Sequence, residues 1–339
     1  MGRIAAPAAG IKVPGAERLR RLRRTAPLRS LVRSTRLSAA QFVMPLFIVS
    51  GRNRSEPIAS LPGHARLSAD LAVQRARELA KLGVGGVLLF GIPDSKDDDG
   101  SGAADPGGPV PSALRALKDA DLPIVLAADV CLCEYTTHGH CGVIVGEQVD
   151  NDATLPLLAE AAVAYAGAGA DIVGPSAMMD GQVAALRSAL DSAGHPGTAI
   201  IAYASKAASA LYGPFREAAG STPAFGDRRG YQMDYSNARE ALREMELDVR
   251  EGADILMVKL ALTSLDLLVR AGERFDVPLA AYHVSGEVAM LEAAAERGWL
   301  DRRSAGLEML TAIARAGAGI IITYLAADAA RWLQDTPAR

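Results

Sequence analysis

Two lysines follow apolar segments of the kind that form buried strands. The chain has 339 residues and 36 lysines and arginines, of which only six are lysines. Lys206 follows the residues AYAS, and Lys259 follows ILMV. Burial and a second nearby cation both lower the pKa of a lysine and favour the neutral amine that attacks a carbonyl carbon. The pair therefore indicates Schiff-base chemistry; in the alternative reading, each lysine caps a helix or pairs with a carboxylate.

All three cysteines lie within eleven residues, as the array Cys131, Cys133 and Cys141. An odd number cannot form a closed set of disulfides, so the spacing favours a reducing compartment and a metal site. Three thiolates with a fourth position left open are typical of a catalytic rather than a structural zinc site. His138 and His140 lie between the cysteines, where they could serve as ligands instead or hold the loop.

A long segment from Tyr212 to Gln232 carries three arginines, Arg216, Arg228 and Arg229. Long loops of this kind often cover active sites. Guanidinium groups suit a substrate carboxylate, so the segment predicts a lid that binds an acid. The alternative is a solvated loop with ordinary surface arginines.

These residues are placed by a repeated rhythm of apolar strands and amphipathic helices. The helices include ranges 68–82, 154–168, 181–193, 235–251, 288–297 and 304–316. The predicted strands are eight in number: 42–49, 84–90, 124–130, 171–173 with its flanks, 199–204, 255–258, 279–283 and 319–324.

Near-continuous apolar strands alternating with helices indicate a parallel sheet buried on both faces. Eight such units favour a (β/α)₈ TIM barrel, an α/β fold, over an open doubly wound sheet. Neither a GxGxxG after the first strand nor a GxxxxGK[ST] motif occurs. The fold places Lys206 and Lys259 at the carboxyl ends of neighbouring strands, where barrels carry their active sites. We expect one catalytic domain over residues 41–339, preceded by an arm over 1–40 with a disordered leader.

Charge and hydropathy give the expected partners. The formal net charge of −3 offers no global attraction to nucleic acid or membrane. The arginine-rich stretch from Arg18 to Arg36 could bind nucleic acid, but it lacks interleaved aromatics, which favours packing on an acidic neighbour. No apolar run reaches the ~18 residues of a membrane span, and no signal peptide is recognised. We expect a cytoplasmic protein.

The chain resembles the porphobilinogen synthase (5-aminolevulinate dehydratase) family from about Arg18 to Leu333. The segments that carry the resemblance include LFGIPDSKDDDGS, DVCLCEYTTHGHCG, VDNDATL, YGPFREA, GDRRGYQMD, YHVSGEVAML and IIITY. The resemblance implies condensation of two 5-aminolevulinate molecules to porphobilinogen with loss of two waters, in tetrapyrrole synthesis. It also implies a homo-octamer in which the arginine-rich arm embraces a neighbouring subunit.

The resemblance implies a role for particular residues. Lys259 matches the lysine that binds the substrate forming the propionate side, and Lys206 matches the lysine for the acetate side. Asp129 matches an active-site acid. The other matches are Cys131, Cys133 and Cys141 as Zn²⁺ ligands; Ser285 and Tyr324 for the first carboxylate; Arg216, Arg228 and Gln232 for the second; Ser176 and Tyr212 in active-site segments; and Glu244 as a carboxylate linked to allosteric Mg²⁺, for which an ordinary solvated helix glutamate is the alternative.

Several positions depart from the family pattern. After the strand-six lysine the family usually has proline, in a segment like MVKPxxPYLD; this chain has MVKLALTSLD, with Leu260 and Ser264 among the changes. Ala177 and Gln182 stand where it has aspartate and arginine, and Ala207 stands where it has an aromatic residue. These changes raise the alternative of a divergent paralogue with another amino-ketone substrate or weak activity. An aldolase-type lyase would need one lysine and no thiolate zinc, and a metal-storage assembly would need neither lysine.

Overall fold

Eight parallel strands close into a barrel in the computed structural model, which describes residues 18–335. The last strand pairs in parallel with the first, so the barrel sheet is closed. This architecture confirms the expected (β/α)₈ barrel. In hydrogen-bonded order the strands are β1 (Phe42–Val49), β4 (Gly86–Ile92), β5 (Val125–Val130), β8 (Ile172–Pro175), β9 (Ala199–Lys206), β10 (Ile255–Lys259), β11 (Leu279–His283) and β12 (Ile320–Thr323).

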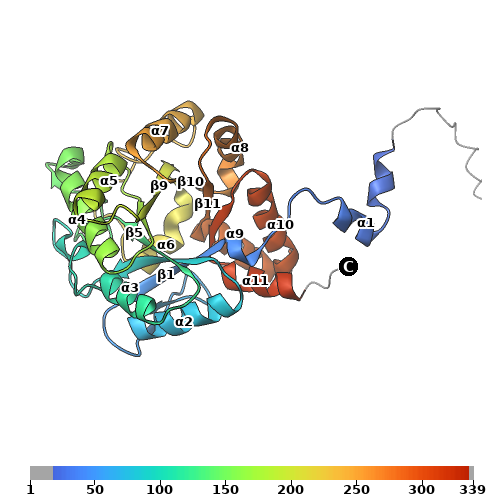
Figure 1. Ribbon diagram of the computed structural model, residues 1–339, viewed down its shortest axis with the longest axis horizontal. Helices are drawn as coiled ribbons and strands as arrows, with labels where there is room; N and C mark the ends of the chain where they lie inside the picture. Colours follow the sequence, from blue (N-terminus) through green and yellow to red (C-terminus); the bar gives the residue numbers. More distant parts are fainter. Residues whose placement is uncertain (1–17, 336–339) are drawn as a thin grey trace, which may run out of the picture.

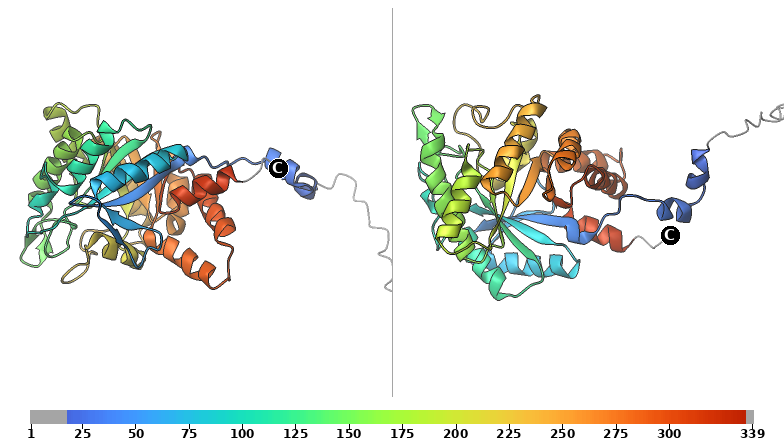
Figure 2. Two further views of the ribbon diagram at one scale, coloured as in Figure 1. Left: turned by 90° about the horizontal axis from the view of Figure 1, so that it is seen from below. Right: turned by 45° about the horizontal axis from the view of Figure 1, so that its top comes forward.

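Helices surround the barrel on its outer side (Figures 1 and 2). Asp150 and Asp301 start two of them, because their side chains accept the N–H groups of Ala153 and Ser304. Gly252 ends another with φ 104°, a left-handed conformation that glycine adopts readily. The helices are α1 (Ala26–Leu31), α2 (Ala69–Lys81), α3 (Pro109–Asp119), α4 (Asn151–Gly167), α5 (Gln182–Ser192), α6 (Gly213–Ala219), α7 (Ala238–Glu251), α8 (Leu265–Arg274), α9 (Ser285–Glu296), α10 (Arg302–Arg315) and α11 (Ala326–Gln334).

Shorter elements decorate the ends of the barrel. The short strand β3 (Ala65–Leu67) pairs with the carboxyl end of β1 and with β2 (Ser55–Pro57), while β6 (Ile144–Val145) and β7 (Gln148–Val149) form a hairpin. The 3-10 helices of the described chain are η1 (Leu19–Arg23), η2 (Ala39–Gln41), η3 (Ser101–Ala103), η4 (Ala210–Tyr212) and η5 (Leu262–Ser264).

Side chains alternate between the barrel interior and the helices. On β10, Ile255 and Met257 join the interior cluster that contains Tyr282. Leu256 and Val258 pack outward against the helices. This two-residue period points the last residue of the strand, Lys259, into the barrel at its carboxyl end.

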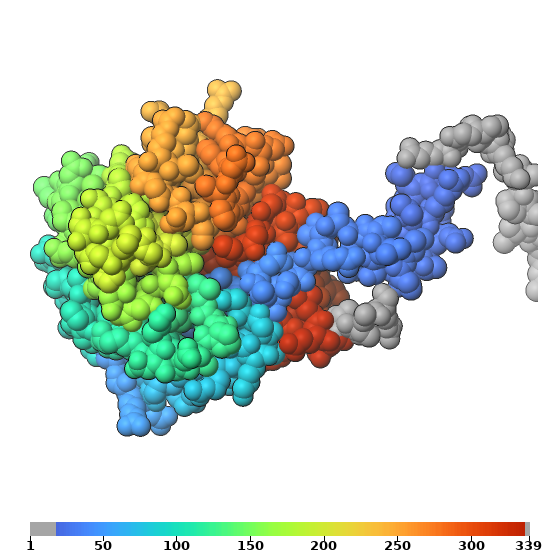
Figure 3. Space-filling view, in the orientation of Figure 1, coloured from blue at the N-terminus to red at the C-terminus, as the bar shows by residue number. Residues whose placement is uncertain are grey.

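Residues 18–36 project from the barrel, as the blue segment at the right of Figure 3 shows, whereas Leu37 and Ala39 pack against the core. None of residues 18–36 is buried, and the apolar side chains of Leu19, Leu22, Leu31 and Val32 are exposed. The leader that we expected to be disordered falls largely in residues 1–17, outside the described part of the chain. No helix of residues 18–335 has the length and apolar run needed to cross a membrane.

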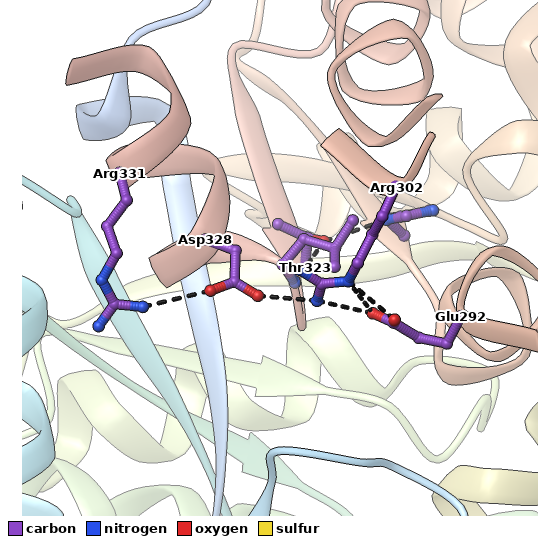
Figure 4. Close-up of polar contacts among 7 residues, drawn as sticks. Glu292, Arg302, Thr323, Asp328 and Arg331 are labelled. Atoms are coloured by element: carbon purple, nitrogen blue, oxygen red, sulfur yellow. Dashed lines mark hydrogen bonds and ion pairs between the residues drawn. The ribbon is translucent and has the colours of Figure 1, made fainter. Parts of the chain in front are cut away.

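An ion-pair network joins the last three helices (Figure 4). Arg302 of α10 makes a bidentate contact with Glu292 of α9, and its Nη2 lies 2.8 Å from Asp328 of α11. Asp328 also accepts a hydrogen bond from Arg331 at 3.2 Å. The Arg302 guanidinium lies 5.2 Å from the ring centre of Trp332. One arginine therefore connects the helices that flank the closing strand.

We expect Arg302→Ala to lower the free energy of unfolding by about 1–2 kcal/mol, since bidentate and networked ion pairs exceed isolated surface pairs. Urea unfolding followed by circular dichroism measures the change. Arg270→Ala is the matched control, because Arg270 forms an exposed ion pair with Asp266 within α8 at 3.6 Å. Equal midpoints for the two variants would contradict the role given to the network.

Candidate active site

Lys206 and Lys259 lie side by side at the carboxyl ends of β9 and β10, where they are partners in the strand register. Between the pairs Leu256–Ala202 and Val258–Ser205, β9 uses three residue steps against two in β10. Such a bulge reverses the alternation of one strand. It therefore turns Lys206 to the same side as Lys259.

Lys259 is almost fully buried in an aromatic setting. Burial, followed by the charge of Lys206, lowers the pKa of Lys259 to about 7, and the carboxylate of Asp129 opposes this shift. Near neutral pH a large fraction of this amine is neutral and nucleophilic. Four aromatic rings have their centres 4.2–5.4 Å from its Nζ atom: Tyr203, Tyr212, Phe215 and Tyr282.

A proton-holding group lies beside Lys206. The Nζ of Lys206 donates to the backbone carbonyl of Ser176, and the hydroxyl of Ser176 donates to Oδ2 of Asp129 at 2.9 Å. The Oδ1 atom of Asp129 is buried and has no hydrogen-bond partner among residues 18–335. Burial raises the pKa of Asp129, although both lysines oppose the shift. This carboxyl group can hold or release a proton next to the amines.

The three cysteines lie close together at the end of the barrel where the two lysines lie, in the loop that follows β5. Their Sγ atoms all lie within 4.8 Å of one another, with 3.4 Å between Cys131 and Cys133, and all three thiols are buried and unpaired. Hydrogen bonds from the other two thiols, with the charge of Arg228 nearby, lower the pKa of Cys141. Tetrahedral zinc with Zn–S bonds of about 2.3 Å would separate its sulfurs by about 3.8 Å, so the cluster fits a thiolate metal.

The two histidines of this loop have other partners. The ring nitrogens of His140 lie 3.1 Å from Tyr231 Oη and 3.0 Å from the carbonyl of Phe225. His138 lies between the carbonyl of Asp98 and the backbone N–H of His140, each at 3.0 Å. This geometry favours the alternative in which the histidines hold the loop. In the described chain, the cysteines are the one group of histidine, cysteine and acidic side chains close enough to share an ion.

Unsatisfied polar groups converge on the segment expected to be a lid. The Nε atoms of Arg216 and Arg228 and both amide atoms of Gln232 are buried without hydrogen-bond partners in the described structure. Arg228 is anchored by the carbonyls of Gly139 and Ser221, at 2.8 and 2.6 Å. Buried polar groups left without partners are rare and suit a polar ligand. Arg229, by contrast, is exposed and does not face the site.

The residues expected at the first carboxylate contact residues whose rings surround Lys259. Ser285 begins α9, and its Oγ accepts the N–H of Phe215 at 3.0 Å. Tyr324 contacts Tyr282 through their hydroxyls, which are 3.4 Å apart. Tyr212 donates its hydroxyl to the carbonyl of Ala207 at 2.8 Å. All of these side chains are buried around the barrel mouth.

The site is closed over a small cavity. The cavity holds about 10 Å³, close to the space needed for one water molecule. Part of its cover is α6, a helix inside the segment predicted as loop. This helix brings Phe215 and Arg216 over Lys259. Within the segment predicted as a lid, Tyr212, Phe215, Arg216 and Arg228 line this cavity.

Sequence reasoning missed part of the lining. Glu134 is buried beside the cavity and accepts a hydrogen bond from Cys133 at 3.3 Å. Burial, then the nearby Asp129, raises the pKa of Glu134 to about 7. In the sequence, its position directly after Cys133 could have indicated that Glu134 lies at the site. The aromatic Tyr203 and Tyr282 were also missed, although both occupy inward positions of predicted strands.

The departures from the family pattern are accommodated inside the fold. The backbone of Ala207 donates to the carbonyl of Lys259 at 3.3 Å and accepts from Tyr212, contacts that need no aromatic side chain. Ala177 and Leu260 are fully packed. Gln182 is buried at the start of α5, where its amide donates to the carbonyl of Pro175.

Glu244 lies apart from these groups, on α7 outside the barrel. It is partly buried, and burial raises its pKa, helped by the charges of Asp180, Glu251 and Glu240.

Comparisons with known proteins give the family. The family model for delta-aminolevulinic acid dehydratase matches residues 16–332. The delta-aminolevulinic acid dehydratase of Synechococcus elongatus is 54% identical over 320 residues, covering 93% of this chain and 98% of that protein. The enzyme of that name from Mycobacterium tuberculosis is 52% identical over 321 residues, covering 94% and 97%.

A solved structure agrees in fold over nearly the same span. The delta-aminolevulinic acid dehydratase (porphobilinogen synthase) of Toxoplasma gondii, solved with its reaction product porphobilinogen, matches with a TM-score of 0.92 and 42% identity. The match covers 95% of this chain and 93% of that one. This chain is therefore an enzyme that belongs to the delta-aminolevulinic acid dehydratase family.

Proposed function

We propose that this enzyme condenses two molecules of 5-aminolevulinate to porphobilinogen through Schiff bases on Lys259 and Lys206. The observation that carries the proposal is the pair of buried lysines at neighbouring strand ends, facing one cavity with a cysteine cluster at its edge. One carbonyl substrate would need one such lysine, whereas two lysines suit two ketones.

The lysines would activate the two ketones in the same way. Neutral Nζ of Lys259 attacks the ketone carbon of the first substrate, and the oxygen leaves as water when the C=N bond forms. Lys206 does the same for the second substrate. The two ketone oxygens account for the two waters lost, and both lysines return as free amines when the ring closes. Asp129 takes up or supplies protons at its unpartnered Oδ1.

The substrate carboxylates would occupy separate ends of the site. Ser285 and Tyr324 hold the first substrate's carboxylate near Lys259. Arg216, Arg228 and Gln232 hold that of the second substrate, which their unpartnered atoms support. The backbone carbonyl of Ser176 accepts a hydrogen bond from Lys206 and so orients its amine. The hydroxyl of Tyr212 donates to the carbonyl of Ala207, the residue that follows Lys206.

The cysteines Cys131, Cys133 and Cys141 would hold Zn²⁺ beside the second substrate. Such an ion supplies Lewis acidity or a bound hydroxide. The three unpaired thiols also support a cytoplasmic, reducing location. Outside the barrel, Glu244 is a candidate partner of an allosteric Mg²⁺.

The arm would join subunits of a homo-octamer, as residues 1–40 distinct from a catalytic domain over 41–339. Four large apolar side chains of the arm, Leu19, Leu22, Leu31 and Val32, are exposed in the single chain. Exposed apolar side chains clustered on a projecting arm favour burial against a neighbour.

Incubation with 5-aminolevulinate and zinc tests the proposal. We expect a pyrrole product with the mass of porphobilinogen, measured by its colour reaction with an aromatic aldehyde. Absence of pyrrole from folded, zinc-loaded protein would reject the proposal, and turnover of another amino ketone in its place would identify a divergent paralogue.

A further inference from the structure

A buried glutamate connects the chain that follows Lys259 to the start of the helix that carries Ser285. Glu287 occupies the first turn of α9 and is fully buried. Its Oε2 accepts the N–H of Val284 and its Oε1 accepts the N–H of Leu262, both at 2.8 Å. A buried carboxylate is unfavourable unless hydrogen bonds satisfy it, and these two bonds use one oxygen each.

The bond to Leu262 holds the chain that follows Lys259. Leu262 comes three residues after the lysine, at the start of η5. Ala261, between them, donates to the carbonyl of Tyr282 on β11 at 3.0 Å. Ala207 donates to the carbonyl of Lys259 itself at 3.3 Å. The backbone from Lys259 to Leu262 is therefore held by Ala207, which follows β9, by Tyr282 of β11 and by the Glu287 carboxylate.

The bond to Val284 holds the start of the helix that carries Ser285. Val284 immediately precedes α9, and Ser285 is its first residue. Through one carboxylate, the segment that follows the Schiff-base lysine is tied to the segment that holds the carboxylate anchor of the same substrate. The positive end of the α9 dipole also favours an acidic side chain at this place.

We propose that Glu287 is a positioning residue that sets the separation between Lys259 Nζ and the carboxylate anchor at Ser285. The inference rests on the proposed function, because it assumes that one substrate spans these two residues. A substrate held at both ends reacts only when its ketone carbon meets the amine, and a misplacement of about 1 Å can cost about 100-fold in rate.

Glu287→Gln removes one acceptor, since an amide has a single acceptor oxygen, and Glu287→Asp shortens the reach by one methylene. We expect the rate constant for borohydride trapping of 5-aminolevulinate on Lys259 to fall about 10–100-fold in Glu287→Gln and by a smaller factor in Glu287→Asp, with kcat falling in parallel. The trapping amplitude, which counts folded sites, stays near one per Lys259.

Asp254→Asn is the matched control. Oδ2 of Asp254 accepts the N–H of Ile200 at 2.8 Å, next to the opposite end of β10. This variant makes the same acid-to-amide change at the other end of β10, where the one remaining amide oxygen can still accept the N–H of Ile200, and its trapping rate constant stays at the wild-type value.

The outcomes separate the inference from the function on which it rests. A wild-type rate constant in folded Glu287→Gln and Glu287→Asp would overturn the positioning role, as would a lower amplitude at an unchanged rate constant. If Glu287→Gln does not fold, Glu287→Asp decides. If the wild-type protein itself forms no lysine adduct with 5-aminolevulinate, the proposed function fails and this inference falls with it.

Discussion

Replacing Lys259 with methionine is expected to lower kcat by at least about 10⁴-fold, the scale of loss when a covalent nucleophile is removed. Methionine keeps most of the side-chain volume among the surrounding aromatic rings, so the fold is retained. Because the amine has a pKa of about 7, its neutral fraction increases as pH rises through that value. The wild-type trapping rate should therefore rise with pH and level off above the pKa.

Lys118→Met is the control for this change. Lys118 is exposed and contacts Asp171 at 3.5 Å, away from the site. It should keep wild-type kcat in the pyrrole assay. Equal activities for the two variants would show that Lys259 is not the nucleophile.

The second large effect is expected at the cysteines. Chelation should lower kcat by at least about 100-fold, and added Zn²⁺ should restore it, since loss of even an outer hydrogen-bond partner costs a metal site 10–100-fold. Cys131→Ser should weaken zinc binding by at least this factor, as measured by competition with a chromophoric chelator.

His195→Asn is a suitable control because His195 lies between α5 and β9, outside the cysteine loop. This variant should keep one zinc ion per chain at wild-type affinity. Full activity in protein shown to be metal-free would contradict the role given to the thiols.

The barrel could be predicted because each strand carries its own apolar pattern. The predicted strands 42–49 and 279–283 coincide with β1 and β11. The direction of Lys206 could not be predicted. A strict two-residue period from Tyr203, which faces inward, would turn Lys206 outward, and only the bulge against β10 corrects this. A bulge depends on the pairing of two strands rather than on the sequence of one.

The length and arginines of residues 212–232 predict a lid, but they do not predict the helix inside the segment. α6 has seven residues, too few for a helical periodicity to be evident, and it begins at Gly213 and ends before Gly220. Which arginines face the cavity also depends on tertiary contacts. Arg228 is held by carbonyls of Gly139 and Ser221, while its neighbour Arg229 is solvated.

The connecting role of Glu287 was likewise invisible in the sequence. The residue reads as a helix-starting glutamate, and its bond to Val284 is local. Its bond to Leu262 crosses between two βα units and appears only when both strands are placed. Local chemistry is therefore readable from spacing, whereas contacts between units require the fold.

Peptide mapping after borohydride reduction tests the central claim most directly. The zinc-loaded protein is mixed with 5-aminolevulinate, reduced, digested and analysed by mass spectrometry. We expect a stable substrate adduct on the peptide containing Lys259. No lysine adduct at all, or an adduct confined to a surface lysine such as Lys118, would contradict it.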